Sequence, residues 1–452
     1  MAENRTPRGR ETKIAILLIA AAAVARILLA TGSPQAVGYV YDLYHKPILK
    51  YAKTGEIPPT RECFMCYHPP LYTLVGERVF ALGQELGDGD KDFSLRTVAF
   101  FSTLIFAAFA WVAYRIVCVY VSDPRHRLVS LALLLVLPVL FISSFAIESD
   151  LLTSLFMLGA LLAYLRYERS GHHPGWVVAM GVLSGLGAST KYSALVIVAA
   201  LGLLLGLQLV RTRKRAIVTH ALVYALLCVA LGSWRYVENY REQGVWVIDS
   251  EAKIRAQRFA RRKGVRFHTD EYRFADFRLG EFIDILRPDS PEQELKHFPA
   301  YDESVWTSIY GQFWTDGSVF SNPSRHGLRR GWYPTKPIPM PLVTGVLVFG
   351  LVPLALTGVG FVLAFGRLPG SAPLLVLFSL GAGAYTYYLL GFNEWILKAK
   401  YLLFLIPGAL VWISWALSAA GRTHPHLERG LLAWLWVLVA AAYAYDVAFA
   451  VL

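Results

Sequence analysis

Long apolar stretches separated by short polar turns make up most of this chain. The stretch at 128–147 contains no charged residue, and the stretch at 341–364 is similar. About 20 apolar residues in a helix cross the hydrocarbon core of a bilayer, so each stretch predicts a transmembrane helix. The pattern predicts about 11 of them. They are expected at 14–32, 97–114, 128–147, 151–165, 175–190, 193–210, 216–234, 341–364, 371–392, 401–420 and 430–450.

Two long segments interrupt this pattern, at 33–95 and 235–340. The first contains a stretch whose apolar positions follow helical spacing, namely Leu43, Pro47, Ile48 and Tyr51. Such a face is typical of a helix that lies in the membrane interface. A second interfacial helix is expected after the Pro-Pro pair at 69–70, because proline is accepted in the first turn of a helix. In the second segment, we interpret the aromatic stretch ESVWTSIYGQFWTDG as packing rather than stacking on sugar rings.

The pattern therefore predicts an all-α polytopic membrane protein in three parts. Residues 1–234 form a transmembrane module with a first outer loop at 33–95, residues 235–340 form an outer loop domain after the seventh span, and 341–452 hold the C-terminal transmembrane helices. Cytoplasmic loops carry an excess of Lys and Arg, which orients the N-terminus to the cytoplasm. The basic loop residues are Arg125, Arg127, Arg166, Arg169, Arg211, Arg213, Lys214, Arg215, Arg367, Arg422 and Arg429.

Composition supports this fold and narrows the function. Of the 452 residues, 55% are hydrophobic and 17% are charged, with a mean hydropathy of +0.44, which excludes soluble and fibrous proteins. Much of the net charge of +12 lies in short loops, so we expect membrane lipids and not nucleic acid as partners. Four cysteines are too few for a disulfide scaffold. Cys63 and Cys66 form either a local disulfide or two thiols, and zinc is not expected there because His68 alone could add a ligand nearby.

Charged residues at the ends of the apolar stretches are the first candidates for chemistry. Glu148 and Asp150 lie between two stretches that we expect to be uninterrupted helices, which leaves both acids at the outer face, either solvated or facing a cavity. Lys191 lies alone at the tip between two spans, where it snorkels or pairs with an anion. Lys400 enters a span from the outer side, against the topology rule. Arg26, inside the first stretch, can snorkel to the far interface.

Three further candidates belong to the outer segments. Asp42 starts the first interfacial helix. It either caps this helix or serves as a reactive acid. His68 precedes the second interfacial helix, whose free N–H groups suit a phosphate. His68 either binds this phosphate as well or hydrogen-bonds a backbone carbonyl. With Arg235 at the start of the second long segment, acids and cations gather at one level of the membrane. A lipid-linked phosphosugar needs this set, because cations hold the phosphate and an acid acts as general base.

Six motifs follow one another along the chain: YDLYHKPILKYAKTGEIPP, YHPPLYTL, ESDLLTSLFMLGALLAYLRY, GLGASTKYSAL, GSWRYVENYREQG and KAKYLLFLIPG. In their order and spacing the chain resembles the GT-C superfamily of polyprenol-phosphate-dependent glycosyltransferases. The nearest branch holds the protein O-mannosyltransferases and the lipid A aminoarabinose transferase. The resemblance covers 1–245 well and 340–420 loosely, and it implies a GT-C fold.

The resemblance also implies roles for the candidates. Asp42 is the catalytic base that deprotonates the acceptor. From their position at the outer face, Glu148 and Asp150 are expected to form an acceptor or second acidic site. The donor phosphate is held by His68, Lys191, Arg235, Lys400 and Tyr401. Relatives often place a second acid directly after the first, whereas here Leu43 follows Asp42. We therefore expect metal-independent chemistry without a cofactor, and a divalent metal is not favoured.

The expected function is that of an inverting, integral membrane glycosyltransferase. It would move a sugar from an undecaprenyl or dolichyl phosphate to a hydroxyl of a lipid, glycan or protein. The reaction would take place on the non-cytoplasmic face of a plasma or inner membrane, or of the endoplasmic reticulum. A ligase or polymerase of lipid-linked glycans is the nearest alternative. A transporter or flippase would want charged or broken helices near mid-membrane, and a scaffold would not need acids and cations at one leaflet.

Overall fold

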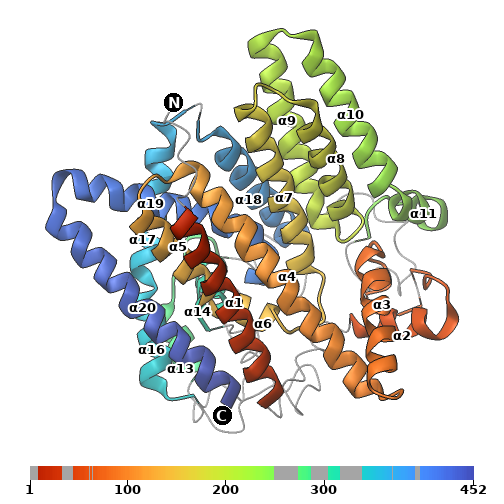
Figure 1. The fold of residues 1–452 in the computed structure, drawn as a ribbon, viewed down its shortest axis with the longest axis horizontal. Coiled ribbons are helices and arrows are strands. Elements are labelled where there is room, and N and C mark those ends of the chain that lie inside the picture. Colours follow the sequence, from red (N-terminus) through yellow and green to blue (C-terminus); the bar gives the residue numbers. More distant parts are fainter. Residues whose placement is uncertain are drawn as a thin grey trace.

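A computed structural model describes residues 9–32, 44–60, 62–63, 65–248, 273–286, 304–315, 338–368, 370–391 and 398–451. The regular structure in these ranges is helical, apart from an isolated bridge between Arg273 and Ser304. The predicted all-α class is therefore confirmed. Figure 1 shows the helices as an elongated bundle in which α9 and α10 extend past their neighbours at one end.

The helices follow the apolar stretches closely. In chain order they are α1 (Gly9–Gly32), α2 (His45–Thr54), α3 (Leu71–Leu86), α4 (Lys91–Tyr120), α5 (Pro124–Leu135), α6 (Pro138–Ser143), α7 (Asp150–Arg169), α8 (Pro174–Ala188), η2 (Tyr192–Ala194), α9 (Leu195–Thr212), α10 (Arg215–Gly232), α11 (Trp234–Gln243), α13 (Leu279–Ile285), α14 (Val305–Thr315), α16 (Met340–Phe349), α17 (Leu351–Phe365), α18 (Ala372–Gly391), η6 (Ala399–Leu405), α19 (Ile406–Thr423) and α20 (Pro425–Val451).

Nine helical stretches within the described ranges are long and apolar enough to cross a membrane. They coincide with nine of the predicted spans. The predicted span at 175–190 is the shorter helix α8, and the one at 128–147 is not a single helix. The structure thus supports a multi-pass membrane protein, but it does not confirm the predicted count of about 11 spans.

The expected uninterrupted helix at 128–147 is wrong, because the chain breaks at Pro138. Proline has no N–H and its ring clashes with the preceding turn, so α5 ends at Leu135 and α6 restarts at Pro138. Arg26 of α1 donates from Nη2 to the carbonyl of Leu135 at 2.6 Å, and its guanidinium lies 4.0 Å from the ring centroid of Phe106. Arg26 is buried rather than snorkelling to the interface as expected, because it binds the carbonyl at the end of α5.

Small residues let two of the spans approach closely. A Cβ at Gly181 of α8 would lie 2.8 Å from the Cβ of Leu227, and one at Gly185 would lie 2.8 Å from the Cβ of Leu231. Both leucines belong to α10. Glycines four residues apart on one helix face are a common device for close packing inside a membrane. This pairing fixes the end of α8, which leads directly into Lys191.

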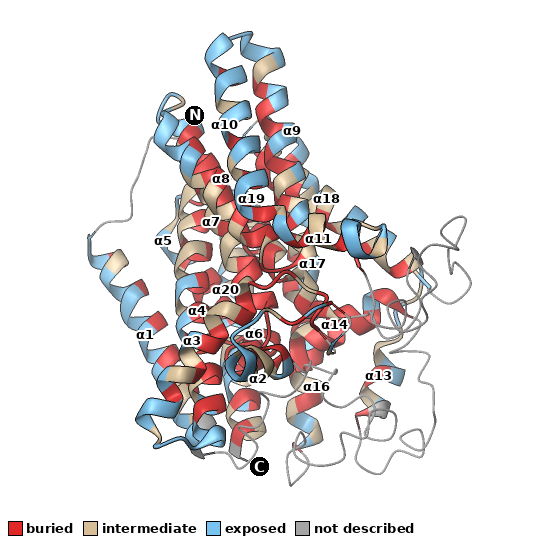
Figure 2. Cartoon of the chain, turned by 90° about the vertical axis from the view of Figure 1, so that its right-hand side faces the viewer, coloured by how far each residue is buried: buried red, intermediate tan, exposed pale blue. Residues whose placement is uncertain are grey.

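The most buried helices surround the break in the α5–α6 region. Figure 2 shows buried residues concentrated towards the centre of the molecule, including α4, α6 and α14. Helix α14 belongs to the predicted outer segment 235–340, yet it packs against α6, α16 and η6, with Tyr310 and Trp314 buried. For the described part of the aromatic stretch, this agrees with the packing role expected from the sequence.

Basic loops meet at one end of the bundle. Arg169 donates from Nη2 to the carbonyl of Val119 at 2.5 Å, and the guanidinium of Arg367 lies 4.4 Å from the ring centroid of Trp415. The indole of Trp415 in turn donates to the carbonyl of Tyr120. The first residues of α7 and the segment before α19 lie at the opposite ends of their helices. The bundle therefore has one end rich in basic loops and one end that holds the candidate site.

Candidate active site

The joint between α6 and α7 is an irregular segment held inside the bundle. The Ser102 hydroxyl of α4 donates to the carbonyl of Ala146 at 2.8 Å, and the Thr103 hydroxyl donates to that of Ser144 at 2.9 Å. These side chains satisfy carbonyls that a helix would otherwise pair with its own backbone. Glu148 and Asp150 are consequently buried, each 3% exposed, so the solvated alternative considered from the sequence is wrong.

Four buried charges meet at this joint, and we call Glu148, Asp150, Lys191 and Lys400 the quartet. Lys400 Nζ lies 2.5 Å from Glu148 Oε2, and Lys191 Nζ lies 2.5 Å from Asp150 Oδ1. Lys400 Nζ is also 3.9 Å from Asp150 Oδ2, which joins the two pairs. Two carboxylates and two ammonium groups balance formally. A single unpaired charge at this depth would be strongly unfavourable, so the pairing allows all four to be buried.

Lys191 remains charged in this setting. Burial is the largest single effect and would lower the pKa of the Lys191 ammonium. The charge and hydrogen bond of Asp150, together with Tyr401, outweigh it and raise the pKa above its ordinary value. Of the two alternatives drawn from the sequence, pairing with an anion is the one observed. The ammonium also lies 4.4 Å from the ring centroid of Tyr401, where the ring face adds attraction for a cation.

Helix α14 holds the segment that carries Lys400. The backbone N–H of Ala399 donates to Gln312 Oε1 at 2.8 Å, and both residues are buried. Gln312 Nε2 donates to Ser308 one turn earlier. The 3₁₀ turn of η6 is thus anchored by a side chain from the predicted outer segment. Gln312 was missed by sequence reasoning, because a glutamine within an aromatic stretch gives no sign of its long-range partner.

His68 lies in a group of tyrosines beside the quartet. Its ring stacks on Tyr44 with a centroid distance of 5.6 Å and lies 4.3 Å from Tyr67 and 5.7 Å from Tyr192. The Tyr192 hydroxyl donates to the carbonyl of Tyr67 at 2.5 Å. Ser149, between the two quartet acids in sequence, donates to the Tyr44 hydroxyl at 2.8 Å. Tyr44 therefore connects His68 with the quartet.

A disulfide closes the turn that precedes His68. Cys63 and Cys66 are bonded, which decides between the two alternatives that the sequence left open. The Cys66 N–H donates to the Cys63 carbonyl, and the His68 N–H donates to the Met65 carbonyl. The second helix of this loop, α3, begins at Leu71 after the two prolines, as expected. His68 is thus held between a closed turn and a helix start.

Arg235 lies beside an apolar groove rather than in the quartet. Its Nη1 is 2.6 Å from Glu238 Oε2, and its Nη2 donates to the carbonyl of Pro58 at 3.3 Å. The groove has a volume of about 330 Å³. Its lining includes Pro70, Leu74, Leu186, Leu231, Trp234 and Arg235. It connects the start of α3 with the ends of α8 and α10, and one buried guanidinium lies at its edge.

The structure therefore gathers most, but not all, of the predicted site residues. It brings Glu148, Asp150, Lys191, Lys400 and Tyr401 together. His68 is one contact away through Tyr44, and Arg235 lies at the groove. Asp42 lies outside the described residues. Tyr44, Tyr192 and Ser149 are site residues that sequence reasoning missed, since nothing in their own spacing marks them.

Comparison with known proteins agrees with this architecture. Residues 68–234 match the family model described as dolichyl-phosphate-mannose-protein mannosyltransferase. The crystal structure of ArnT from Cupriavidus metallidurans in the apo state is similar, with a TM-score of 0.51 and 14% identity, over 97% of this chain and 76% of that one. The Archaeoglobus fulgidus oligosaccharyltransferase tethered with an acceptor peptide gives a TM-score of 0.51 and 13% identity, over 96% of this chain and 55% of that one.

No curated protein matches the sequence. At identities this low, the similarity to solved structures concerns the fold. The family match covers residues 68–234, which include His68, both quartet acids and Lys191. With the all-α bundle and its apolar spans, these findings show that the chain has a fold similar to that of these membrane proteins.

Proposed function

We propose that the protein is a membrane glycosyltransferase that takes a sugar from a polyprenyl phosphate and gives it to a hydroxyl acceptor. The observation that carries this proposal is the buried quartet next to His68, together with an apolar groove whose lining includes Pro69, which follows His68, and Arg235. A phosphate attached to an isoprenoid chain presents an anion and a long apolar tail. Cations beside an apolar groove match both parts of such a molecule.

The lysines can bind a phosphate without leaving their carboxylates. An ammonium group has three N–H donors. Among its contacts with described residues, Lys191 makes one hydrogen bond, to Asp150, so other donors can turn towards an anion. Glu148 and Asp150 would then keep the two ammonium groups in position while the leaving phosphate gains charge. Preorganised cations of this kind stabilise a transition state because they need little rearrangement during the reaction.

The proposed reaction is a single displacement with inversion. The Asp42 carboxylate takes the proton of the acceptor hydroxyl, whose oxygen forms a bond to the anomeric carbon. The bond from that carbon to the phosphate oxygen breaks, and its electron pair stays on the phosphate, near Lys191, Lys400 and His68. The charges of Glu148 and Asp150 are already engaged by ammonium groups, so neither is proposed as the base. Asp42 is given this role because its motif resembles the first-loop acid of the family. The mechanism uses no metal.

Placement on the non-cytoplasmic face belongs to the same proposal. The disulfide at 63–66 borders the site, and disulfides persist in oxidising compartments. The basic loops gather at the other end of the bundle, as cytoplasmic loops do. The N-terminus would then be cytoplasmic, and the site would open to the periplasm or to an organelle lumen.

Transfer by the purified protein tests the proposal. Radiolabelled polyprenyl-phosphate sugars would be offered in detergent with lipid, glycan and peptide hydroxyl acceptors. Asp42→Asn should lower turnover by about 10²- to 10⁴-fold, the range for loss of a general base. Glu56→Gln changes an exposed acid of the same loop and serves as the matched control. If Asp42→Asn kept turnover within a few-fold of Glu56→Gln, the base assignment would fail.

A transporter or flippase is the second candidate, because the structure contains the broken helix and the buried charges that such a protein would want. The break at Pro138 and the buried Arg26 and Asp446 are the observations in its favour. Detergent separates the two candidates, since a transferase still makes product when there are no longer two compartments. Absence of product from every donor, together with lipid movement in sealed vesicles, would favour the transporter.

A further inference from the structure

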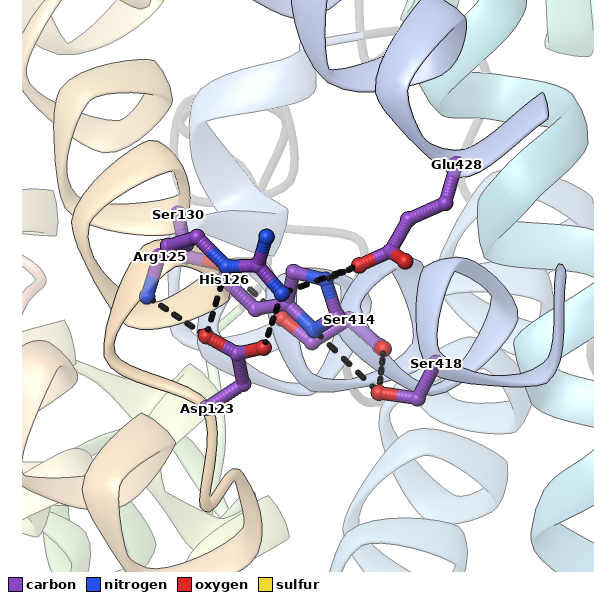
Figure 3. Close-up of polar contacts among 7 residues, drawn as sticks. All are labelled: Asp123, Arg125, His126, Ser130, Ser414, Ser418 and Glu428. Carbon is purple, nitrogen blue, oxygen red and sulfur yellow. Dashed lines mark hydrogen bonds and ion pairs between the residues drawn. The ribbon is translucent and has the colours of Figure 1, made fainter. Parts of the chain in front are cut away.

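A second charged group lies at the end of the bundle opposite the quartet, where α5, α19 and α20 meet (Figure 3). We call Asp123, Arg125, His126 and Glu428 the α5–α20 cluster. Asp123 caps α5 by accepting the backbone N–H of Arg125 at 2.8 Å. His126 is 2% exposed, and its Nε2 lies 2.8 Å from Glu428 Oε1. The cluster joins distant parts of the chain, since His126 and Glu428 are 302 positions apart.

Ser418 lies at hydrogen-bond distance from His126. The Ser418 hydroxyl donates to the Ser414 carbonyl at 2.8 Å, and its oxygen lies 3.2 Å from His126 Nδ1. In the tautomer with the proton on Nδ1, the ring donates to Ser418, and the lone pair of Nε2 faces Glu428 and can bind a cation. Histidines that bind metals are usually oriented in this way, by a hydrogen bond from the other ring nitrogen.

The cluster already holds one cation between its carboxylates. Arg125 Nη2 lies 3.0 Å from Asp123 Oδ2 and 3.7 Å from Glu428 Oε1. The Arg125 side chain is 65% exposed, so it can turn into solvent. An exposed ion pair of this kind would weaken the binding of another cation at the same carboxylates by about fivefold at most. A cation that binds them more tightly can therefore displace Arg125. The ligand atoms of Asp123, His126 and Glu428 all lie within 4.8 Å of one another.

We propose that the α5–α20 cluster is a binding site for one divalent metal ion of the zinc type. His126 Nε2, one Asp123 oxygen and one Glu428 oxygen would be its protein ligands, and Arg125 would turn outward. One nitrogen and two oxygens with a remaining open position suit zinc, whereas magnesium and calcium prefer shells made of oxygen alone. Ligand atoms around tetrahedral zinc lie about 3.3 Å apart. The widest gap therefore closes by rotation of the two carboxylate side chains.

Such an ion would clamp two distant parts of the chain. It would tie the start of α5 to the start of α20 and so hold the last helix against the bundle. The site lies at the other end of α19 from Lys400 and takes no part in the proposed sugar transfer. The inference is therefore independent of the proposed function, and either one can fail alone.

Metal content of the intact protein tests the site. The full-length protein in detergent would be stripped with a chelator, dialysed against micromolar zinc or millimolar magnesium, and analysed for bound metal by mass spectrometry. Zinc should bind at about one ion per chain, and magnesium should not bind. His126→Gln and Glu428→Gln, which keep hydrogen-bonding side chains, should weaken zinc binding by at least tenfold, about the loss expected when a ligand is removed.

Two further variants make the test specific. His424 and His426 are exposed on the same turn, so the double variant His424→Ala/His426→Ala removes adventitious surface ligands and should retain the zinc. Arg125→Ala removes the competing cation and should tighten zinc binding by roughly two- to fivefold. Three results would each overturn the site: no zinc on the wild type, equal zinc on His126→Gln, or loss of zinc in the double histidine variant alone. The cluster would then be a hydrogen-bonded contact between His126 and Glu428 that holds α5 against α20.

Discussion

The quartet and the α5–α20 cluster are both four-residue groups of acids and cations, yet their surroundings differ. Every member of the quartet is at most 8% exposed, whereas Arg125 of the α5–α20 cluster is mostly exposed. The quartet draws on the joint before α7, the first residue of α7, the residue before η2 and the 3₁₀ helix η6. The cluster draws on the starts of α5 and α20. Burial makes the quartet pairs hard to separate, while the cluster can exchange its resident cation with little loss.

The largest expected effect comes from breaking a quartet pair. Lys400→Met leaves the Glu148 carboxylate buried without its ammonium partner, which should lower the free energy of unfolding by about 3–5 kcal/mol. Denaturant titration in detergent measures the loss. The double variant Glu148→Gln/Lys400→Met removes both charges and should recover more than half of it. If the double variant were no more stable than the single one, the two charges would not act as a pair.

The next largest loss of stability is expected at Gln312, which holds the segment that carries Lys400. Gln312→Leu leaves the buried Ala399 N–H without its acceptor, which should lower the free energy of unfolding by about 1–3 kcal/mol. Because the same N–H positions the segment of Lys400, turnover should fall together with stability. Trp306→Phe changes an exposed residue of the same helix and is the matched control. Equal effects of the two substitutions would show that α14 does not position the site.

A smaller effect is expected at the α5–α20 cluster in metal-free protein. Arg125→Ala breaks an exposed pair with Asp123, so the free energy of unfolding should change by less than about 1 kcal/mol. The difference between this loss and the loss from Lys400→Met measures how much burial increases the contribution of a paired cation to stability. A loss of several kcal/mol from Arg125→Ala, by the same titration, would mean that exposure does not separate the two groups.

The smallest effect is expected from acid pH. It acts through His45, which belongs to neither the quartet nor the α5–α20 cluster. Burial, with help from Lys46 and Lys91, lowers the pKa of His45 to about 4 from its ordinary value of 6.5. The unfolded chain therefore binds more protons between these values, and the stability contributed by neutral His45 is lost as pH falls from 6.5 to 4. His45 is partly exposed, so the loss should be on the order of 1 kcal/mol. His45→Gln should remove this slope before any acid effect is attributed to either group.

The positions of most helices could be predicted, because apolar length alone decides whether a stretch spans a membrane. The break at Pro138 was missed although a proline inside an apolar stretch is a local signal for it. The contact of Arg26 with the Leu135 carbonyl, from 109 residues away, could not be read from the sequence. The sequence also placed α14 in an outer segment. Its burial depends on contacts with η6 and α16 that no local pattern records.

The sequence predicted which residues belong to the site better than it predicted how they are arranged. Their positions at the ends of apolar stretches selected both acids and both lysines of the quartet, but long-range packing decides which acid pairs with which lysine. Tyr44 and Gln312 act through partners more than 80 residues away, such as Ser149 and Ala399, so their roles could not be read locally. His126 was overlooked because it lies among basic loop residues that topology already explained.

The distance in sequence between Glu148 and Lys400 also has a consequence for biosynthesis. The two are 252 residues apart. At ribosomal rates of about 5–20 residues per second, Glu148 is made roughly 10–50 s before its partner. During that interval the nascent chain carries an acid destined for a dry interior without the cation that neutralises it. Glu148 therefore needs water or another partner until the segment with Lys400 has been made.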